Sequence, residues 1–270
     1  MSAGLNADWL AALHQRANQP PLRPRLPLFF AGALVGSLEA AFFNEIAALP
    51  AWNGHSLLQK TEHGIVATDL NALALAMRDA ALCGPWRGEA LAVYALTDQA
   101  HEEGKPQQRI GTIERGAVRP LGIPTQAVHL VGWAEGGGMW VQQRALTKAN
   151  DPGQWDTLMG GMVSAADTLP QALERETWEE AGLHTRQLPS LRHGGQVRIR
   201  RPSEDARGMG YMVEQIDWFA ATVPQGTTPL NQDGEVERFE LLQRPELLER
   251  LHDNAFTLEA SLILAAALGV

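Results

Sequence analysis

The sequence predicts a mixed α/β sandwich preceded by a smaller α+β unit, and three observations support this fold class. In the second half of the chain, strand-like segments stand on both sides of one central acidic helix, as in a sandwich with a mixed sheet. The first third alternates short strand-like and helix-like segments. The length of 270 residues suits one large domain or two modest ones. We therefore place an N-terminal α+β domain at residues 1–120 and the sandwich at residues 121–270.

The elements of the first domain follow from apolar spacing and from turn and capping residues. A short amphipathic helix around Trp9 and Leu13 stops at Pro20. Asp69 is placed to cap a helix that ends at Gly84. The remaining expected elements are a strand pair over 26–36, a helix capped by Ser37 and running to about Leu49, a β-rich segment over 56–69 with a turn at His63 and Gly64, a strand over 90–96 and a loop over 97–108.

The second domain begins near Leu121 with a predicted hairpin, because two strand-like segments flank three consecutive glycines. The apolar segment 260–270 is too short to span a bilayer, and we interpret it as a buried terminal helix. The expected strands cover 126–135, 139–146 and 211–223, with further strand character from Trp155 into Gly160 and Gly161, and the other expected helices are the acidic one and 245–252.

The net charge, the cysteine count and the N-terminal sequence limit the partners and the compartment that we expect. The net charge is −9, so no broad basic surface for a nucleic-acid polymer is expected. Cys83 is the sole cysteine, which excludes an intrachain disulfide and fits a reducing compartment. The N-terminal sequence has neither the basic flank nor the apolar run of a signal peptide. We therefore expect a cytoplasmic protein with no membrane partner.

The acidic helix has the spacing of a metal site. Glu176, Glu179 and Glu180 stand at positions i, i+3 and i+4, so at about 100° per residue their carboxylates share one face, whereas Glu174 points elsewhere. Such a cluster offers hard oxygen ligands that suit Mg²⁺ or Mn²⁺. Mg²⁺ keeps several waters and reaches substrate phosphates, so we expect a phosphate-containing ligand. The alternative is a solvated acidic face.

The residues around this helix favour the metal site over the solvated face. Thr168 or Asp167 can cap its start, and Gly182 stands where a left-handed C-terminal residue belongs. Before the helix, Gly160 and Gly161 allow the backbone to bend and to come close to a ligand, with a carbonyl free to bind metal.

The segment from Gly161 to Leu183 resembles the Nudix box. That pattern is a Gly, five residues, a Glu, seven residues, Arg-Glu, an aliphatic residue, any residue, Glu-Glu, any residue, Gly and an aliphatic residue. Here Gly161 is followed by Asp167 and then by the run that starts at Arg175. Asp167 replaces the Glu, and Thr177 replaces the aliphatic residue. Neither departure removes a carboxylate from the predicted metal face.

The resemblance implies an α/β/α sandwich that hydrolyses a diphosphate linked to a variable group. Water attacks phosphorus, while divalent ions neutralise the diphosphate and activate the water. Many family members use a further Glu after the box as ligand or base, and here Glu235 is the candidate and Glu237 the runner-up. The resemblance implies as metal ligands Glu176, Glu179, Glu180 and the Gly161 carbonyl, and as catalytic residues Glu176, Glu180, Glu235 and Arg175, which orients the glutamates.

Further segments, which together cover roughly residues 26–245, look like one branch of this family. This branch is related to the domain fused to thiamin pyrophosphokinase in fungi, and it carries a distinctive N-terminal domain. It is associated with hydrolysis of thiamin diphosphate, especially oxidised or damaged forms, to the monophosphate. The resemblance therefore implies a small-molecule diphosphate as substrate, with thiamin diphosphate first. The alternative substrates are a nucleotide sugar, a dinucleotide or an oxidised nucleotide.

Candidate substrate-binding residues lie around the box. Arg144 and Lys148 bracket the approach to Gly160 and could hold the diphosphate. Trp155 could stack on a heteroaromatic ring, as could Trp133 and Trp140, although a core position is the alternative for all three. Arg109 and Arg115 could come from the N-terminal domain to close the pocket, or could dock the two domains. That domain could equally form a homodimer.

Two rival functions share the same fold. The first rival is an isopentenyl-diphosphate isomerase, whose resemblance would imply a catalytic cysteine inside the fold. The sole cysteine, Cys83, lies in the N-terminal unit, which argues against this function. The other rival is a non-catalytic ligand sensor. Sensors of that kind often lose carboxylates from the box, whereas Glu176, Glu179 and Glu180 are all present here. The histidines stand in no ligand spacing, so His129 and the others are interpreted as structural or exposed.

Overall fold

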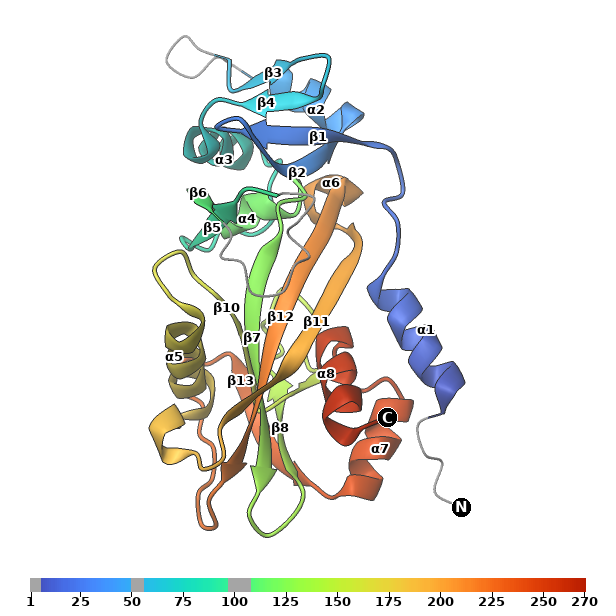
Figure 1. Cartoon of the computed structure of the whole chain (residues 1–270), viewed down its shortest axis with the longest axis vertical. Helices are drawn as coiled ribbons and strands as arrows, with labels where there is room; N and C mark the ends of the chain where they lie inside the picture. Colours follow the sequence, from blue (N-terminus) through green and yellow to red (C-terminus); the bar gives the residue numbers. More distant parts are fainter. Residues whose placement is uncertain (1–5, 50–55, 97–107) are drawn as a thin grey trace.

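The computed structural model describes residues 6–49, 56–96 and 108–270, and it places a small N-terminal sheet at one end of a larger sheet (Figure 1). The small sheet has the strand order β2-β1-β4-β3. β1 and β2 are antiparallel and joined at Ala31 and Gly32, which both have positive φ, so the predicted strand pair is confirmed. The elements from the N-terminus to Asp79 are α1 (Ala7–Ala17), β1 (Arg25–Phe30), β2 (Ala33–Glu39), α2 (Ala40–Ala47), β3 (Leu58–Lys60), β4 (Ile65–Ala67) and α3 (Leu70–Asp79).

The helix predicted to begin at Ser37 begins later in the chain. Ser37 lies within β2, where its hydroxyl accepts a hydrogen bond from Arg25 Nε at 3.0 Å. Glu39 occupies the N-cap position of α2, and its side chain makes no capping hydrogen bond to the helix. The prediction of Ser37 as a cap is wrong because the sheet and the partly buried Arg25 use this serine instead. Asp69, in contrast, caps α3 as predicted.

A short hairpin and a single-turn helix connect the two sheets. The strand predicted over 90–96 is confirmed, and most of the loop predicted over 97–108 lies outside the described residues. One buried apolar cluster runs from the N-terminal sheet, at Leu28, to the C-terminal helix, at Leu262. The connecting elements are β5 (Ala90–Tyr94), β6 (Arg109–Glu114) and α4 (Arg115–Val118).

The larger sheet has strands of both directions. Its order is β11-β12-β7-β8-β13, with β10 beside β7 and β9 beside β8, and β12 runs parallel to β7. β7 and β8 form the predicted hairpin, but they pair only at Gly132–Trp140 and Trp133–Met139, after which β10 takes the place beside β7. The strands are β7 (Thr125–Ala134), β8 (Met139–Arg144), β9 (Trp155–Asp156), β10 (Met159–Met162), β11 (Arg192–Ser203), β12 (Gly210–Val223) and β13 (Val236–Leu242).

Helices cover both faces of this sheet, which confirms the predicted α/β/α sandwich (Figure 1). α5 packs on one face, where Val128 and Leu130 of β7 join Leu173 in one buried cluster. Ala127 and Val131 point to the opposite face, on which α7 and α8 lie, because side chains alternate along a strand. The remaining elements are α5 (Leu169–Ala181), the 3₁₀ turn η1 (Thr185–Gln187), α6 (Asp205–Gly208), α7 (Arg244–His252) and α8 (Leu258–Leu268).

The apolar C-terminal segment forms a buried helix, as predicted. Ile263 and Leu264 of α8 are fully buried, and α1 from the N-terminus packs against the same helix. No helix in the described parts of the chain combines the length and apolar character that a membrane crossing requires.

Candidate active site

Two consecutive glycines bring β10 directly against the acidic helix. Gly161 faces α5, and a Cβ at this position would overlap the carboxylate of Glu176. Gly160 faces the other way, where a Cβ would overlap the ring of His129. The close approach that the sequence predicts at these glycines therefore exists, and the approaching groups are side chains of the protein itself. Any larger residue would displace one of them.

The ends of α5 are those that the sequence predicts. Thr168 is the N-cap and forms a capping box with Gln171, whose Oε1 accepts a hydrogen bond from the Thr168 backbone N–H at 2.8 Å. Gly182 ends the helix with a φ of 64°. Glu174 points away from the other glutamates and accepts a hydrogen bond from the backbone N–H of Thr185. These ends fix the remaining glutamates relative to β10.

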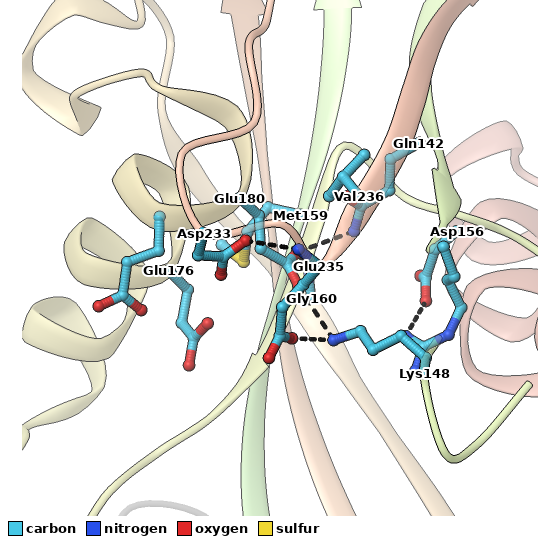
Figure 2. Close-up of polar contacts among 12 residues, drawn as sticks. Gln142, Lys148, Asp156, Met159, Gly160, Glu176, Glu180, Asp233, Glu235 and Val236 are labelled. Carbon is cyan, nitrogen blue, oxygen red and sulfur yellow. Dashed lines mark hydrogen bonds and ion pairs between the residues drawn. The ribbon is translucent and has the colours of Figure 1, made fainter. Parts of the chain in front are cut away.

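Glu180 is the most enclosed glutamate of α5 (Figure 2). Its residue is 1% exposed, and its Oε2 accepts hydrogen bonds from the Gly160 backbone N–H at 2.9 Å and from Gln142 Nε2 at 2.8 Å. Its Oε1 lies 3.8 Å from Lys148 Nζ. Burial raises the pKa of Glu180, although these partners oppose the rise. The carboxylate is therefore held in one position by neutral donors, with a single cation nearby.

Glu176 joins Glu180 in a buried carboxylate pair. Its side chain is 12% exposed and packs against Gly161. Burial and then the neighbouring charge of Glu180 raise the pKa of Glu176 to about 7. Two buried carboxylates that disfavour each other's charge are stabilised by a cation between them.

Arg175 is the hub that orients the acidic side chains. Its Nε donates to Asp167 Oδ2 at 2.9 Å, and its Nη1 donates to Glu176 Oε1 at 2.9 Å and to Glu179 Oε2 at 3.0 Å. Burial opposes the charge, but Glu176 and Asp167 together raise the pKa of Arg175 above its ordinary value. The shorter Asp167 thus still reaches the arginine. Glu179, which is 40% exposed at its side chain, is turned toward Arg175.

The donor set fits a divalent cation. Gln142 Oε1 is buried and has no hydrogen-bond partner among the described residues, so a further oxygen lies next to the Glu180 carboxylate. Together with the buried pair and the predicted Gly161 carbonyl, these are hard oxygen ligands. Over residues 6–49, 56–96 and 108–270, no three His, Cys, Asp or Glu side chains converge as an ion-binding group by themselves. The fit therefore rests on the buried pair and on the space that Gly161 leaves for it.

Lys148 connects the buried pair to Glu235. Its Nζ contacts the carboxylate of Glu235 as well as approaching Glu180, and Figure 2 shows it reaching between them. Burial lowers the pKa of Lys148. Glu235 directly precedes β13, and its backbone N–H donates to Asp233 Oδ1 at 2.8 Å. The structure thus brings Glu235 to the site, whereas Glu237 is exposed further along β13.

A basic cavity of about 280 Å³ adjoins these residues. Arg144 lines it and is held by the carbonyl of Asn150 and by Asp156, 3.4 Å from its Nη1. Arg115 enters from the N-terminal part, paired with Glu89 at 2.8 Å. The charged residues that line this basic cavity are Arg87, Arg115, Arg144, Lys148, Glu89 and Glu235. Two predicted substrate-binding residues, Arg144 and Lys148, therefore converge here.

The structure places the other two predicted substrate-binding residues elsewhere. Arg109 Nη1 donates to the carbonyl of Ala165 at 2.6 Å, so it fastens the loop before α5 and lines none of the cavities described here. Trp155 is 7% exposed, and its ring is covered by Arg250 at 4.5 Å and Arg238 at 5.3 Å. Trp155 thus occupies the core position that was the alternative to stacking on a substrate.

Several residues of the site carry no local sequence signal. Gln142 is one of two glutamines in an ordinary strand, and only its long-range contact with Glu180 distinguishes it. His129 is buried beneath Gly160, with Nδ1 2.9 Å from Thr157 Oγ1 and 3.5 Å from Asp156 Oδ1, and burial lowers its pKa. The structural role expected for His129 is consistent with this position. The polar groups at residues 156 and 157 could be recognised only after the sheet register was known.

Comparison with known proteins places the chain in a family. Residues 124–262 match the NUDIX domain. Nudix hydrolase 24, chloroplastic, from Arabidopsis thaliana is 27% identical over 148 residues, which is 54% of this chain and 40% of that protein. Nudix hydrolase 20, chloroplastic, from the same plant is 27% identical over 148 residues, which is 54% of this chain and 38% of that protein. The chain thus spans less than half the length of these two relatives.

A solved structure, that of DR0079 from Deinococcus radiodurans, superposes with a TM-score of 0.49. It is 20% identical in sequence, and the match covers 66% of this chain and 99% of that chain.

Proposed function

The chain belongs to the Nudix family, and we propose that it is a divalent-metal-dependent hydrolase of a small organic diphosphate. The product would be the corresponding monophosphate. The observation that carries this proposal is the buried pair Glu176 and Glu180, held against the Gly160–Gly161 strand and adjoining a basic cavity. A cation is favoured at the carboxylates, and a diphosphate is favoured by the arginines and the lysine beside them.

The proposed roles follow from the contacts of each side chain. Glu176, Glu180 and the Gly161 carbonyl would hold Mg²⁺ or Mn²⁺, with Glu179 as a further ligand. When bound, the ion supplies charge neutralisation for the diphosphate and acidifies a water. Arg175 fixes Glu176 and Glu179 through its guanidinium. Arg144 and Lys148 bind phosphate oxygens from the basic cavity.

Glu235 is the proposed proton acceptor for the attacking water. Its carboxylate reaches the edge of the site from the loop before β13, where Lys148 holds it. It is less enclosed than Glu180, with 48% of its side chain exposed, so it can exchange the proton with solvent. Glu180 is tied to two neutral donors and is better suited to hold a cation than to move a proton.

The proposed substrate is thiamin diphosphate or one of its oxidised forms. The resemblance of residues 26–245 to the thiamin-related branch motivates this choice. A nucleotide sugar, a dinucleotide or an oxidised nucleotide is the alternative, and the basic cavity would bind the diphosphate of any of them. The organic group therefore decides between these substrates, and a direct comparison of turnover is needed.

The N-terminal part is proposed to complete the substrate pocket. Arg87, Glu89 and Arg115 line the basic cavity from that part of the chain. This supports a pocket role over a purely dimeric role for a domain at residues 1–120, beside the hydrolase domain at 121–270. We also keep the cytoplasm as the proposed compartment, because the lone Cys83 needs no oxidising environment.

The test is monophosphate release from a panel of diphosphates with Mg²⁺ or Mn²⁺, with and without a chelator. The panel contains thiamin diphosphate, its oxidised derivatives, ADP-ribose, NADH, a nucleotide sugar and 8-oxo-dGTP. We expect turnover of the thiamin compounds, its loss on chelation, and a fall of at least about 10³-fold in Glu180→Gln. Glu174→Gln is the matched control, because it removes a carboxylate from the other side of the same helix. Turnover by Glu180→Gln equal to that control would reject the proposed site.

A further inference from the structure

A series of cavities runs from the basic cavity past the glycine strand to a region of opposite charge. A narrow cavity of about 100 Å³ touches Gly160 and Gly161 and shares Arg115 and Arg144 with the basic cavity. It also shares Glu259 with a larger cavity of about 530 Å³, the acidic cavity. The charged residues of the acidic cavity are Asp151, Glu204, Asp205 and Glu259 against Arg119 and Arg201.

Glu214 lies where the narrow cavity meets the sheet. It is 9% exposed, and one of its oxygens accepts a hydrogen bond from Thr125 Oγ1 at 3.1 Å. Among the described residues, its other oxygen has no hydrogen-bond donor, and no cation pairs with the carboxylate within 4.0 Å. A buried carboxylate in this state costs free energy unless a ligand supplies the missing donor.

Glu259, in the first turn of α8, lies beside Glu214 on the same cavity wall. In the described ranges its carboxylate makes no hydrogen bond to another residue and no ion pair. Burial and then the charge of Glu214 raise the pKa of Glu259 to about 7, and a hydrogen bond from its own backbone N–H and the charge of Arg201 only partly oppose the rise. The protein therefore places two carboxylates in one cavity without a cation in contact with either.

Two arginines line the acidic cavity, and neither forms an ion pair with Glu214 or Glu259 among the described residues. Arg119 pairs with Asp205 at 3.4 Å, so its charge is used within the wall. Arg201 lines the acidic cavity but makes no ion pair with Glu259 among the residues described. Among the described residues, no cation pairs with Glu214 or Glu259, and both line the same narrow cavity as Gly160 and Gly161.

We propose that Glu214 and Glu259 recognise the organic end of the diphosphate substrate, and that this end is a nitrogen heterocycle bearing a positive charge or an amino group. The inference rests on the diphosphate hydrolysis proposed above. With the diphosphate among the four cations of the basic cavity, the organic end passes the glycine strand and reaches the two carboxylates. The reverse orientation would place phosphate against the two carboxylates and is disfavoured by their repulsion.

The first test compares two diphosphates that differ at the organic end. Thiamin diphosphate carries a cationic ring and an amino group, and isopentenyl diphosphate carries an uncharged hydrocarbon. At pH 8, we expect Glu214→Gln and Glu259→Gln each to lower the ratio of kcat/KM for the thiamin compound to that for the hydrocarbon compound by about tenfold or more. Glu259→Asp should restore most of this ratio, and Glu249→Gln, at an exposed position of α7, should not change it. An unchanged ratio in both glutamine variants would overturn the assignment.

The second test measures binding without any reaction. Thiamin without phosphate is titrated into wild type, the Glu214→Gln/Glu259→Gln double variant and Glu180→Gln by calorimetry, with circular dichroism to confirm folding. We expect about tenfold weaker binding in the double variant and not in Glu180→Gln. Equal binding in all three proteins, or no binding to wild type, rejects the recognition site. Wild-type binding that depends on the two carboxylates, without turnover of any diphosphate, rejects the hydrolase proposal and keeps the site.

Discussion

The molecule contains two pairs of largely buried carboxylates that differ in their surroundings. Glu176 and Glu259 both have a pKa raised to about 7, in each case by burial and then by a neighbouring glutamate. Glu176 is held by Arg175 at 2.9 Å, and its partner Glu180 accepts two hydrogen bonds. At the other pair, one oxygen of Glu214 accepts a hydrogen bond from Thr125, and no cation among the described residues pairs with either carboxylate.

This difference separates two kinds of functional site. The first pair is oriented by the protein before anything binds, as a metal site that performs chemistry requires. The second pair lies on the proposed substrate path without a cation partner among the described residues, as a specificity site requires. Changes at the first pair should therefore act on turnover, and changes at the second on substrate choice and on stability.

After Glu180→Gln, the largest effect is expected at Glu235, which Lys148 connects to the first pair. Glu235→Gln should lower kcat by about 10²–10³-fold, because it removes the proposed proton acceptor. Glu237→Gln is the matched control, since Glu237 lies two residues away and is exposed on β13. Steady-state kinetics on the best substrate of the panel measures both. Equal kcat in the two variants would assign the proton transfer to another group.

A smaller effect on turnover is expected at Gly161. In Gly161→Ala, the new Cβ would overlap the Glu176 carboxylate, and the pairing of Gly161 with Val128 prevents the strand from moving away. Displacement of the glutamate by about 1 Å should lower kcat/KM about 10²-fold. The control is Gly136→Ala, in the β7–β8 turn, where a Cβ meets no atom within 4 Å. If both variants keep wild-type kcat/KM, the position of Glu176 is not important for catalysis.

The second region should affect stability in a pH-dependent manner. The pKa of Glu259 is raised from an ordinary 4.5 to about 7, so between these pH values the folded protein binds this proton more tightly than the unfolded chain does. Its contribution to the free energy of unfolding is therefore greatest at low pH and falls as the pH rises through about 7. After allowance for solvent screening in the open cavity, we expect a fall of about 1–2 kcal/mol.

Glu259→Gln removes this titration, and unfolding in urea from pH 5 to pH 8 measures the outcome. The variant and wild type should have similar stability near pH 5, and the variant should be the more stable at pH 8. Glu249→Gln, at an exposed position, should follow wild type throughout. Parallel pH profiles for Glu259→Gln and wild type would show that the charge of Glu259 does not destabilise the folded protein.

The two regions also differ in what the sequence reveals about them. The first is local: its glycines, arginine and glutamates lie between residues 160 and 182, where helix geometry fixes the spacing. The second brings together residues 214 and 259 from β12 and α8, and only the register of the sheet and the packing of the helix place them on one wall. Ser37 failed as a predicted cap for the same reason, because the sheet uses its hydroxyl.

The smallest effect is expected at Trp155, where a substitution tests whether this residue belongs to the core or to the substrate pocket. The sequence predicted either stacking on the substrate or burial, and in the structure the ring is 7% exposed and is contacted by Arg250 and Arg238. Trp155→Phe keeps an aromatic ring but weakens these cation–π contacts, so we expect a loss of about 1 kcal/mol or less in unfolding free energy. KM should stay within about twofold, because the ring lines neither the basic nor the narrow cavity of the proposed substrate pocket. A tenfold rise in KM with unchanged stability would show that Trp155 contacts the substrate. The substrate would then reach beyond the two carboxylate pairs.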